Sequence, residues 1–169
     1  MDERAAPPSP QPARRIIASR AEYLAAFDEL LAGARMELRI FDPDLAQLGL
    51  NAPERAERMR QFMLAGRENR VYIALHDIDY VTRSAPRVMS LLTQFSANIA
   101  VHRTEDDAAR AQDCFVLVDA EHMVRRPVAA QPRGVFVAHD LKECQAIRDR
   151  FDEIWQSSVP AVSATQLGL

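Results

Sequence analysis

Three residues bracket one short apolar segment, and their side chains limit the chemistry that it can support. Gln112 and Cys114 open the segment and Asp119 closes it, in the pattern Gln-x-Cys-x4-Asp. Residues 114–118 are apolar and rich in β-branched side chains, which predicts a buried strand. A glutamine amide has no nucleophilic nitrogen, and a buried cysteine cannot supply the fixed positive charge that holds a phosphate. The segment therefore supplies neither a nucleophilic nitrogen nor a fixed positive charge.

Three arginines further along the chain are the best candidates for binding an anion. Arg125 and Arg126 lie at the end of a weaker strand expected around 123–125, and Arg133 precedes a strand expected at 134–138. Their planar guanidinium groups match the geometry of carboxylates and phosphates. The alternative is an exposed hairpin that carries ordinary solubilising charge.

Further polar residues follow the other expected strands. They are Asp42, Asp44, His76, Asp77, Asp79 and His102. If these strands are parallel neighbours, the side chains converge at the sheet edge where open α/β sheets bind ligands, and they could form an oxygen-rich metal site. No spacing matches a specific metal motif, so we expect solvated loop residues and assign no metal ligand. His122 and His139 are isolated in the sequence, and we expect each to be a hydrogen-bonding histidine.

Four helices are expected from apolar residues at helical spacing and from capping residues. Ser19 with Glu22, and Asp140 with Glu143, have capping-box spacing at the start of the first and the last helix. Asn51 is the expected cap of the second helix. These caps divide the chain into an alternation of helices and strands.

The order of the elements predicts the fold class. Strands are expected at residues 16–18, 36–41, 71–75, 99–102, 114–118, 123–125 and 134–138. Helices separate the early strands and short turns join the later ones, which predicts an α/β sandwich with a mixed sheet. The expected core includes residues 115–118, Phe27, Phe62, Phe95, Phe151 and Trp155. Residues 1–13 form a proline-rich tail expected to be disordered, 14–160 the folded domain, and 161–169 an irregular tail.

Composition narrows the functional classes. A chain of 169 residues fits one domain, and its net charge of −3 argues against a general nucleic-acid binder. Two cysteines do not make a disulfide framework. No apolar run reaches the roughly 18 residues of a membrane span, and no signal-peptide core is present. We therefore expect a cytoplasmic protein without a cofactor.

The spacing of Gln112, Cys114 and Asp119 resembles the His-x-Lys-x4-Asp motif of the phospholipase D superfamily. Gln112 occupies the histidine position, Cys114 the lysine position, and Asp119 matches the aspartate. In active members of that superfamily the histidine attacks phosphorus and the lysine holds phosphate oxygens. A Gly-Ser-x-Asn stretch often follows there, whereas this chain has Met-Val-Arg-Arg-Pro at 123–127. The chain is similar to an uncharacterised bacterial phospholipase-D-like family, as a degenerate member with a single motif.

The resemblance covers about residues 14–160 and implies one half-unit of the enzyme fold, a mixed sheet flanked by helices. It implies a pseudoenzyme, a non-catalytic module that binds an anionic ligand or a protein partner and forms a homodimer. Two alternatives stay open. One is a phosphodiesterase or nuclease with a remodelled site, in which His76 or His102 approaches Asp119. The other is a purely structural or regulatory partner domain.

Overall fold

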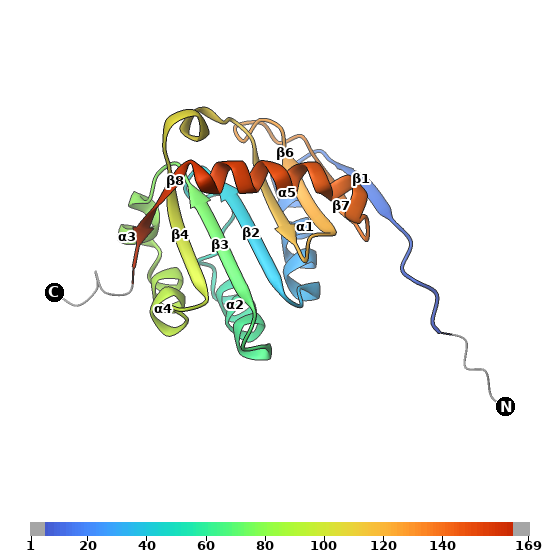
Figure 1. Ribbon diagram of the computed structural model, residues 1–169, viewed down its shortest axis with the longest axis horizontal. Helices are drawn as coiled ribbons and strands as arrows, with labels where there is room; N and C mark the ends of the chain where they lie inside the picture. Colours follow the sequence, from blue (N-terminus) through green and yellow to red (C-terminus); the bar gives the residue numbers. More distant parts are fainter. Residues whose placement is uncertain (1–5, 164–169) are drawn as a thin grey trace.

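The computed structural model describes residues 6–163, which form an α/β sandwich around one eight-stranded sheet (Figure 1). The strands are β1 Ala13–Ile17, β2 Glu37–Asp42, β3 Arg70–Leu75, β4 Ile99–Thr104, β5 Cys114–Val118, β6 His122–Arg126, β7 Gly134–Ala138 and β8 Ser158–Val162. Their order across the sheet is β1-β7-β6-β5-β2-β3-β4-β8. β2, β3 and β4 are parallel, and the remaining pairs are antiparallel. The predicted fold class is confirmed.

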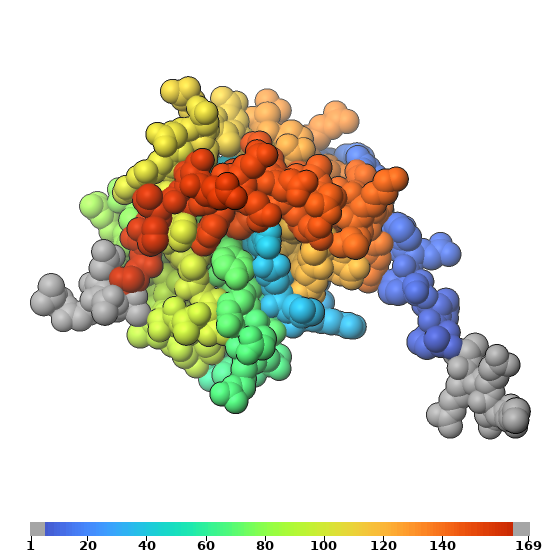
Figure 2. Space-filling model, in the orientation of Figure 1, coloured from blue at the N-terminus to red at the C-terminus, as the bar shows by residue number. Residues whose placement is uncertain are grey.

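Helices cover the two faces of the sheet unequally. They are α1 Arg20–Gly33, α2 Pro53–Ala65, α3 Asp79–Ser84, α4 Pro86–Gln94 and α5 Leu141–Gln156, with a short 3-10 helix at Asp106–Arg110. α1, α2 and α4 lie behind the sheet in Figure 1, and α5 crosses the front face. The space-filling view shows α5 and β8 lying together across this face (Figure 2). Because helices cover both of its faces, every residue of β5 is buried.

Local sequence explains where most helices begin. The Ser19 hydroxyl accepts the Glu22 N–H at 3.1 Å, and the Asp140 carboxylate accepts the Glu143 N–H at 2.9 Å, as the capping-box spacing predicts. The expectation for Asn51 is wrong. Its side-chain oxygen accepts the backbone N–H of Arg87 at 2.9 Å, so it ties the α2 loop to α4 and does not cap α2.

The C-terminal segment departs from the prediction. No strand is expected after 134–138 and an irregular tail is expected from 161, but β8 (Ser158–Val162) pairs with β4 as an antiparallel edge strand. Pro160 is tolerated because an edge strand needs only one row of hydrogen bonds. Two predicted core residues, Phe95 and Trp155, are only half-buried. Trp155 stacks on His102 with ring centroids 3.6 Å apart, at the side of the core rather than inside it.

Candidate functional site

A cleft of about 320 Å³ opens where the motif strand begins. β2 ends at this edge of the sheet, and antiparallel β5 begins beside it, so the end of one strand faces the start of the other. The loops that follow β2 and β6 form the other walls. The polar side chains that line the cleft are Asp42, Asp44, Gln47, Gln112, Cys114 and Arg126. The cleft therefore lies at the two motif positions where the resemblance places a phosphate-binding site.

Arg126 is the cation of this cleft. It is only 4% exposed, and its guanidinium lies 4.3 Å from the centre of the Tyr23 ring. Its Nη2 donates one long hydrogen bond, 3.4 Å, to the Gln47 side-chain oxygen, and its buried Nε has no acceptor. Across residues 6–163, no carboxylate lies within ion-pair distance of it. A buried charge is ordinarily paired, so Arg126 has unused capacity to bind an anion.

Asp42 is the buried acid of the same cleft. It ends β2, and its Oδ2 accepts the backbone N–H groups of Leu45 at 2.7 Å and Asp44 at 3.2 Å. Burial raises the pKa of Asp42 to about 6, and the Asp44 carboxylate adds to this. The two backbone hydrogen bonds and the positive charge of Arg126 lower it in part. Asp42 therefore changes charge close to neutral pH, unlike an ordinary aspartate.

Cys114 and Gln112 differ in exposure. The Cys114 thiol is buried and lies 3.7 Å from the Tyr23 hydroxyl. Burial raises its pKa, helped by Asp42 and opposed by Tyr23 and Arg126, so the thiol stays protonated and is a poor nucleophile. Gln112 is exposed at the rim, where its backbone carbonyl accepts the Ala129 N–H at 2.7 Å.

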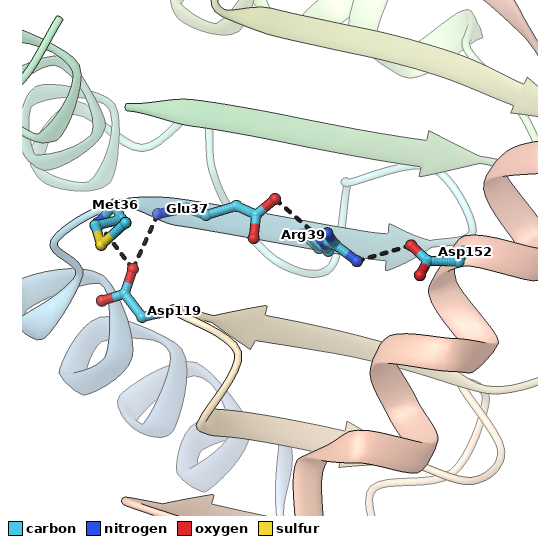
Figure 3. Close-up of polar contacts among 5 residues, drawn as sticks. All are labelled: Met36, Glu37, Arg39, Asp119 and Asp152. Carbon is cyan, nitrogen blue, oxygen red and sulfur yellow. Dashed lines mark hydrogen bonds and ion pairs between the residues drawn. The ribbon is translucent and has the colours of Figure 1, made fainter. Parts of the chain in front are cut away.

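Asp119 lies far from this cleft. It follows the last residue of β5, and at about 3.3 Å per residue the seven-residue separation places it on the order of 20 Å from Gln112. Its carboxylate accepts the backbone N–H groups of Arg35, Met36 and Glu37 at 2.8, 2.8 and 2.9 Å, and Figure 3 shows the last two contacts. Asp119 therefore anchors the entry to β2.

Loss of this anchor should destabilise the fold. We expect Asp119→Ala to lower the free energy of unfolding by about 1–3 kcal/mol, because three N–H groups lose their acceptor, two of them near solvent. Asp119→Asn should cost less, since an amide keeps one acceptor oxygen and tolerates the left-handed backbone at φ 51°. Urea denaturation of the two variants measures the difference, and equal stability of Asp119→Ala and wild type would contradict the anchoring role.

A buried ion cluster, which the sequence does not reveal, supports the start of β5. Asp113, 4% exposed, accepts two hydrogen bonds from Arg150 of α5, at 2.8 and 2.6 Å, and one from Arg125 at 3.3 Å. Burial alone would raise the pKa of Asp113, but the hydrogen bonds and charge of Arg150, with the charge of Arg125, hold it below its usual value. This cluster fixes the strand that presents Gln112 and Cys114 to the cleft.

The three candidate arginines do not converge. Arg125 and Arg126 are adjacent in β6 and point to opposite faces of the sheet, since side chains alternate along a strand. Arg125 contacts Asp113 on the α5 side, whereas Arg126 lines the cleft. Arg133 is exposed in the loop before β7 and does not line the cleft.

The histidines at the ends of the parallel strands serve the framework. Nε2 of His76 donates to the Ala111 carbonyl at 2.8 Å, and its Nδ1 lies 2.6 Å from the Thr104 hydroxyl. Nδ1 of His102 lies 2.9 Å from the Ser158 hydroxyl. His76 thus contacts the residue next to Gln112, at the end of β5 opposite to Asp119. This geometry argues against a remodelled site that joins His76 to Asp119.

His122 and His139 are not isolated. Their rings meet edge to face at 4.6 Å, and Glu121 lies 3.2 Å from Nε2 of His122. These three residues are the one grouping of potential metal ligands within residues 6–163. Nδ1 of His122 accepts the His139 backbone N–H at 3.0 Å, which places the ring proton on Nε2, facing Glu121. Nδ1 of His122 is therefore already used in a hydrogen bond, and its Nε2 lies within ion-pair distance of Glu121.

Solved structures share this fold at low sequence identity. Nuc from Salmonella typhimurium, a phospholipase D family member, is 14% identical with a TM-score of 0.62, over 90% of this chain and 100% of that one. NucT from Helicobacter pylori is 11% identical with a TM-score of 0.59, over 89% and 100%. TrmBL2, an archaeal chromatin protein that binds DNA, is 11% identical with a TM-score of 0.63, over 88% of this chain and 54% of its own. The fold is therefore phospholipase-D-like.

Sequence comparison places the chain in a narrower group than the fold alone does. No curated protein matches the chain. Within the part of the chain that the structure describes, no helix is long and apolar enough to cross a bilayer. The sequence model of one family, described as Domain of unknown function (DUF7931), matches residues 19–167. The chain thus belongs to the DUF7931 family, on a phospholipase-D-like fold.

Proposed function

We propose that this protein is a non-catalytic module on a phospholipase-D-like fold and that it binds an anionic ligand in the cleft at the start of β5. The observation that carries the proposal is the buried guanidinium of Arg126, which has no carboxylate partner in the described chain and has a fully buried Nε without an acceptor. Stacking on Tyr23 and one long bond to Gln47 satisfy it only in part. An oxyanion in the cleft would complete its hydrogen bonding.

The groups around the cleft support a lack of catalysis. Neither histidine nor lysine lines it. Cys114 is buried and stays a thiol, and a glutamine at position 112 cannot form a phospho-enzyme bond. His76, which follows β3 at this edge, already donates its Nε2 proton to the Ala111 carbonyl. We therefore expect binding without turnover.

A phosphodiesterase or nuclease is the second candidate, because Nuc is a phospholipase D family member. The structural likeness to TrmBL2, which binds DNA, favours DNA as a ligand, whereas the net charge of −3 disfavours general nucleic-acid binding. Homodimerisation near Gln112 and the β6 end, and a cytoplasmic location, remain predictions. Sedimentation velocity tests the first of these, and a stable pair should bury more than about 1,000 Å².

Binding of inorganic phosphate at pH 6, followed by NMR or calorimetry, tests the proposed function. Arg126→Met should weaken binding by about tenfold to a hundredfold, the range for hydrogen bonds to a charged group. Arg133→Met is the matched control, since it removes the same charge from an exposed loop outside the cleft, and it should bind like wild type. Equal losses in both variants, or no binding by wild type, would count against the cleft.

A chromogenic phosphodiester assay on the same proteins separates the two candidates. Wild type should release product no faster than buffer does, because neither a histidine nor a lysine lines the cleft and the Cys114 thiol stays protonated. Turnover that disappears in Cys114→Ala or Arg126→Met would instead establish an enzyme with a remodelled site.

A further inference from the structure

Asp42 and Arg126 line the same cleft, yet they do not pair. Each is 4% exposed, and an aspartate and an arginine buried side by side ordinarily form a close, two-pronged ion pair. Here the structure has no ion pair between them within residues 6–163. The cleft therefore presents a buried acid and a buried base that are not neutralised by direct contact.

The free oxygen of Asp42 is the feature that a ligand would meet. Oδ2 already accepts two backbone N–H groups, whereas Oδ1 has no donor among the described residues. Oδ1 is also not fully buried. Among the described residues, the only fully buried side-chain nitrogen or oxygen atoms without a hydrogen-bond partner are the Nε atoms of Arg125 and Arg126. If ionised, this oxygen repels an anion held by Arg126. If protonated, it becomes a hydrogen-bond donor to the same anion.

We propose that the cleft takes up an oxyanion together with one proton, with the anion bound to Arg126 and the proton held on Asp42 and donated to the anion. This inference rests on the proposed function and names its ligand class. The ligand is a phosphate, sulfate or carboxylate group whose oxygen accepts the O–H of a neutral carboxyl. An ionised Asp42 in the same cleft as the one guanidinium repels such a group, and protonation of Asp42 removes that repulsion.

The groups that face Asp42 make it the residue that changes protonation. Burial and Asp44 raise the pKa of Asp42 to about 6, and a bound anion adds negative charge that raises it further. Tyr23 of α1 and Cys114 of β5 have pKa values raised by burial, so both stay neutral at neutral pH. Arg126 of β6 stays charged. His76, which follows β3, points its ring to Thr104 and Ala111.

Calorimetric titration with sulfate tests the inference, because sulfate does not itself titrate between pH 5 and pH 8. Wild-type affinity should fall at least about tenfold from pH 5.5 to pH 7.5, since proton-linked affinity falls by up to tenfold per pH unit above the pKa of the free protein. Titrations at pH 7 in buffers of different ionisation enthalpy should show an uptake approaching one proton per sulfate bound.

Two variants assign the proton. Asp42→Asn should bind sulfate equally at both pH values, with the affinity that wild type has at pH 5.5, and should take up no proton. Asp44→Asn removes the same charge from the same loop and should keep the pH dependence. Wild-type affinity that is equal at both pH values and weakened by Arg126→Met would overturn the proton coupling and leave the proposed function intact. Failure of wild type to bind sulfate at either pH would overturn both.

Discussion

Replacing Asp113 by alanine should lower the free energy of unfolding by about 2–4 kcal/mol, a large share of the roughly 5–15 kcal/mol that stabilises a typical domain. The substitution leaves Arg150 and Arg125 without their shared carboxylate and releases α5 from the start of β5. The Arg150 and Arg125 side chains are 37% and 32% exposed, so hydration of their charges offsets part of the lost stability. Urea denaturation monitored by circular dichroism measures the change.

Two further variants separate this cluster from ordinary surface charge. Arg150→Met should be destabilising, and its effect should not add to that of Asp113→Ala, because both variants break the same contact. Asp152→Ala also removes a carboxylate that contacts an arginine, Arg39 (Figure 3), but the Asp152 side chain is 58% exposed. Asp152→Ala should lower the free energy of unfolding by less than about 1 kcal/mol. Comparable losses in Asp113→Ala and Asp152→Ala would show that burial does not strengthen the cluster.

Replacing Asp42 by asparagine should stabilise the protein at neutral pH. Folding raises the pKa of Asp42 from 3.8 to about 6, so its contribution to stability is complete below about pH 4 and is lost as the pH rises through 6. At pH 7.5 the ionised, buried carboxylate destabilises the fold, and Asp42→Asn should recover about 1–3 kcal/mol. The amide oxygen can still accept the N–H groups of Leu45 and Asp44.

The pH dependence of this stability difference provides the check. The gain from Asp42→Asn should shrink as the pH falls from 7.5 to 4.5, when wild-type Asp42 becomes neutral. Asp44→Asn, which removes the same charge from a half-buried position of the same loop, is the matched control. An Asp42→Asn variant that is less stable than wild type at pH 7.5 would show that the carboxylate is structurally required. A gain would mean that the chain retains a destabilising acid in its cleft.

Much of the fold could be predicted from the sequence because local signals coincide with long-range packing. Residues 114–118 and 134–138 are strands at the expected positions, since apolar β-branched runs suit a buried sheet. β8 was not predictable in this way, because an edge strand is held by main-chain hydrogen bonds to β4 and needs no apolar pattern. Its half-buried residues and Pro160 read as irregular chain.

The candidate site could be predicted only in part. Arg126 was identified by its residue type, and the alternation of side chains along a strand could have separated it from Arg125. The sequence places Asp42 at the end of a strand, but it groups Asp42 with the polar residues of a possible metal site and not with Arg126. Tyr23 was missed because it reads as one more residue of α1, although it lies one turn before Phe27 on the buried face. Its contact with Arg126 joins α1 to β6 and depends on tertiary packing.

A crystal structure grown at about pH 5.5 with selenate tests the central claim most directly, because selenate is a tetrahedral oxyanion that anomalous scattering locates without ambiguity. The account predicts a selenium peak inside the cleft, with selenate oxygens within hydrogen-bonding distance of the Arg126 guanidinium and of the free oxygen of Asp42. An empty cleft, with selenium peaks only at exposed arginines such as Arg133, would contradict it.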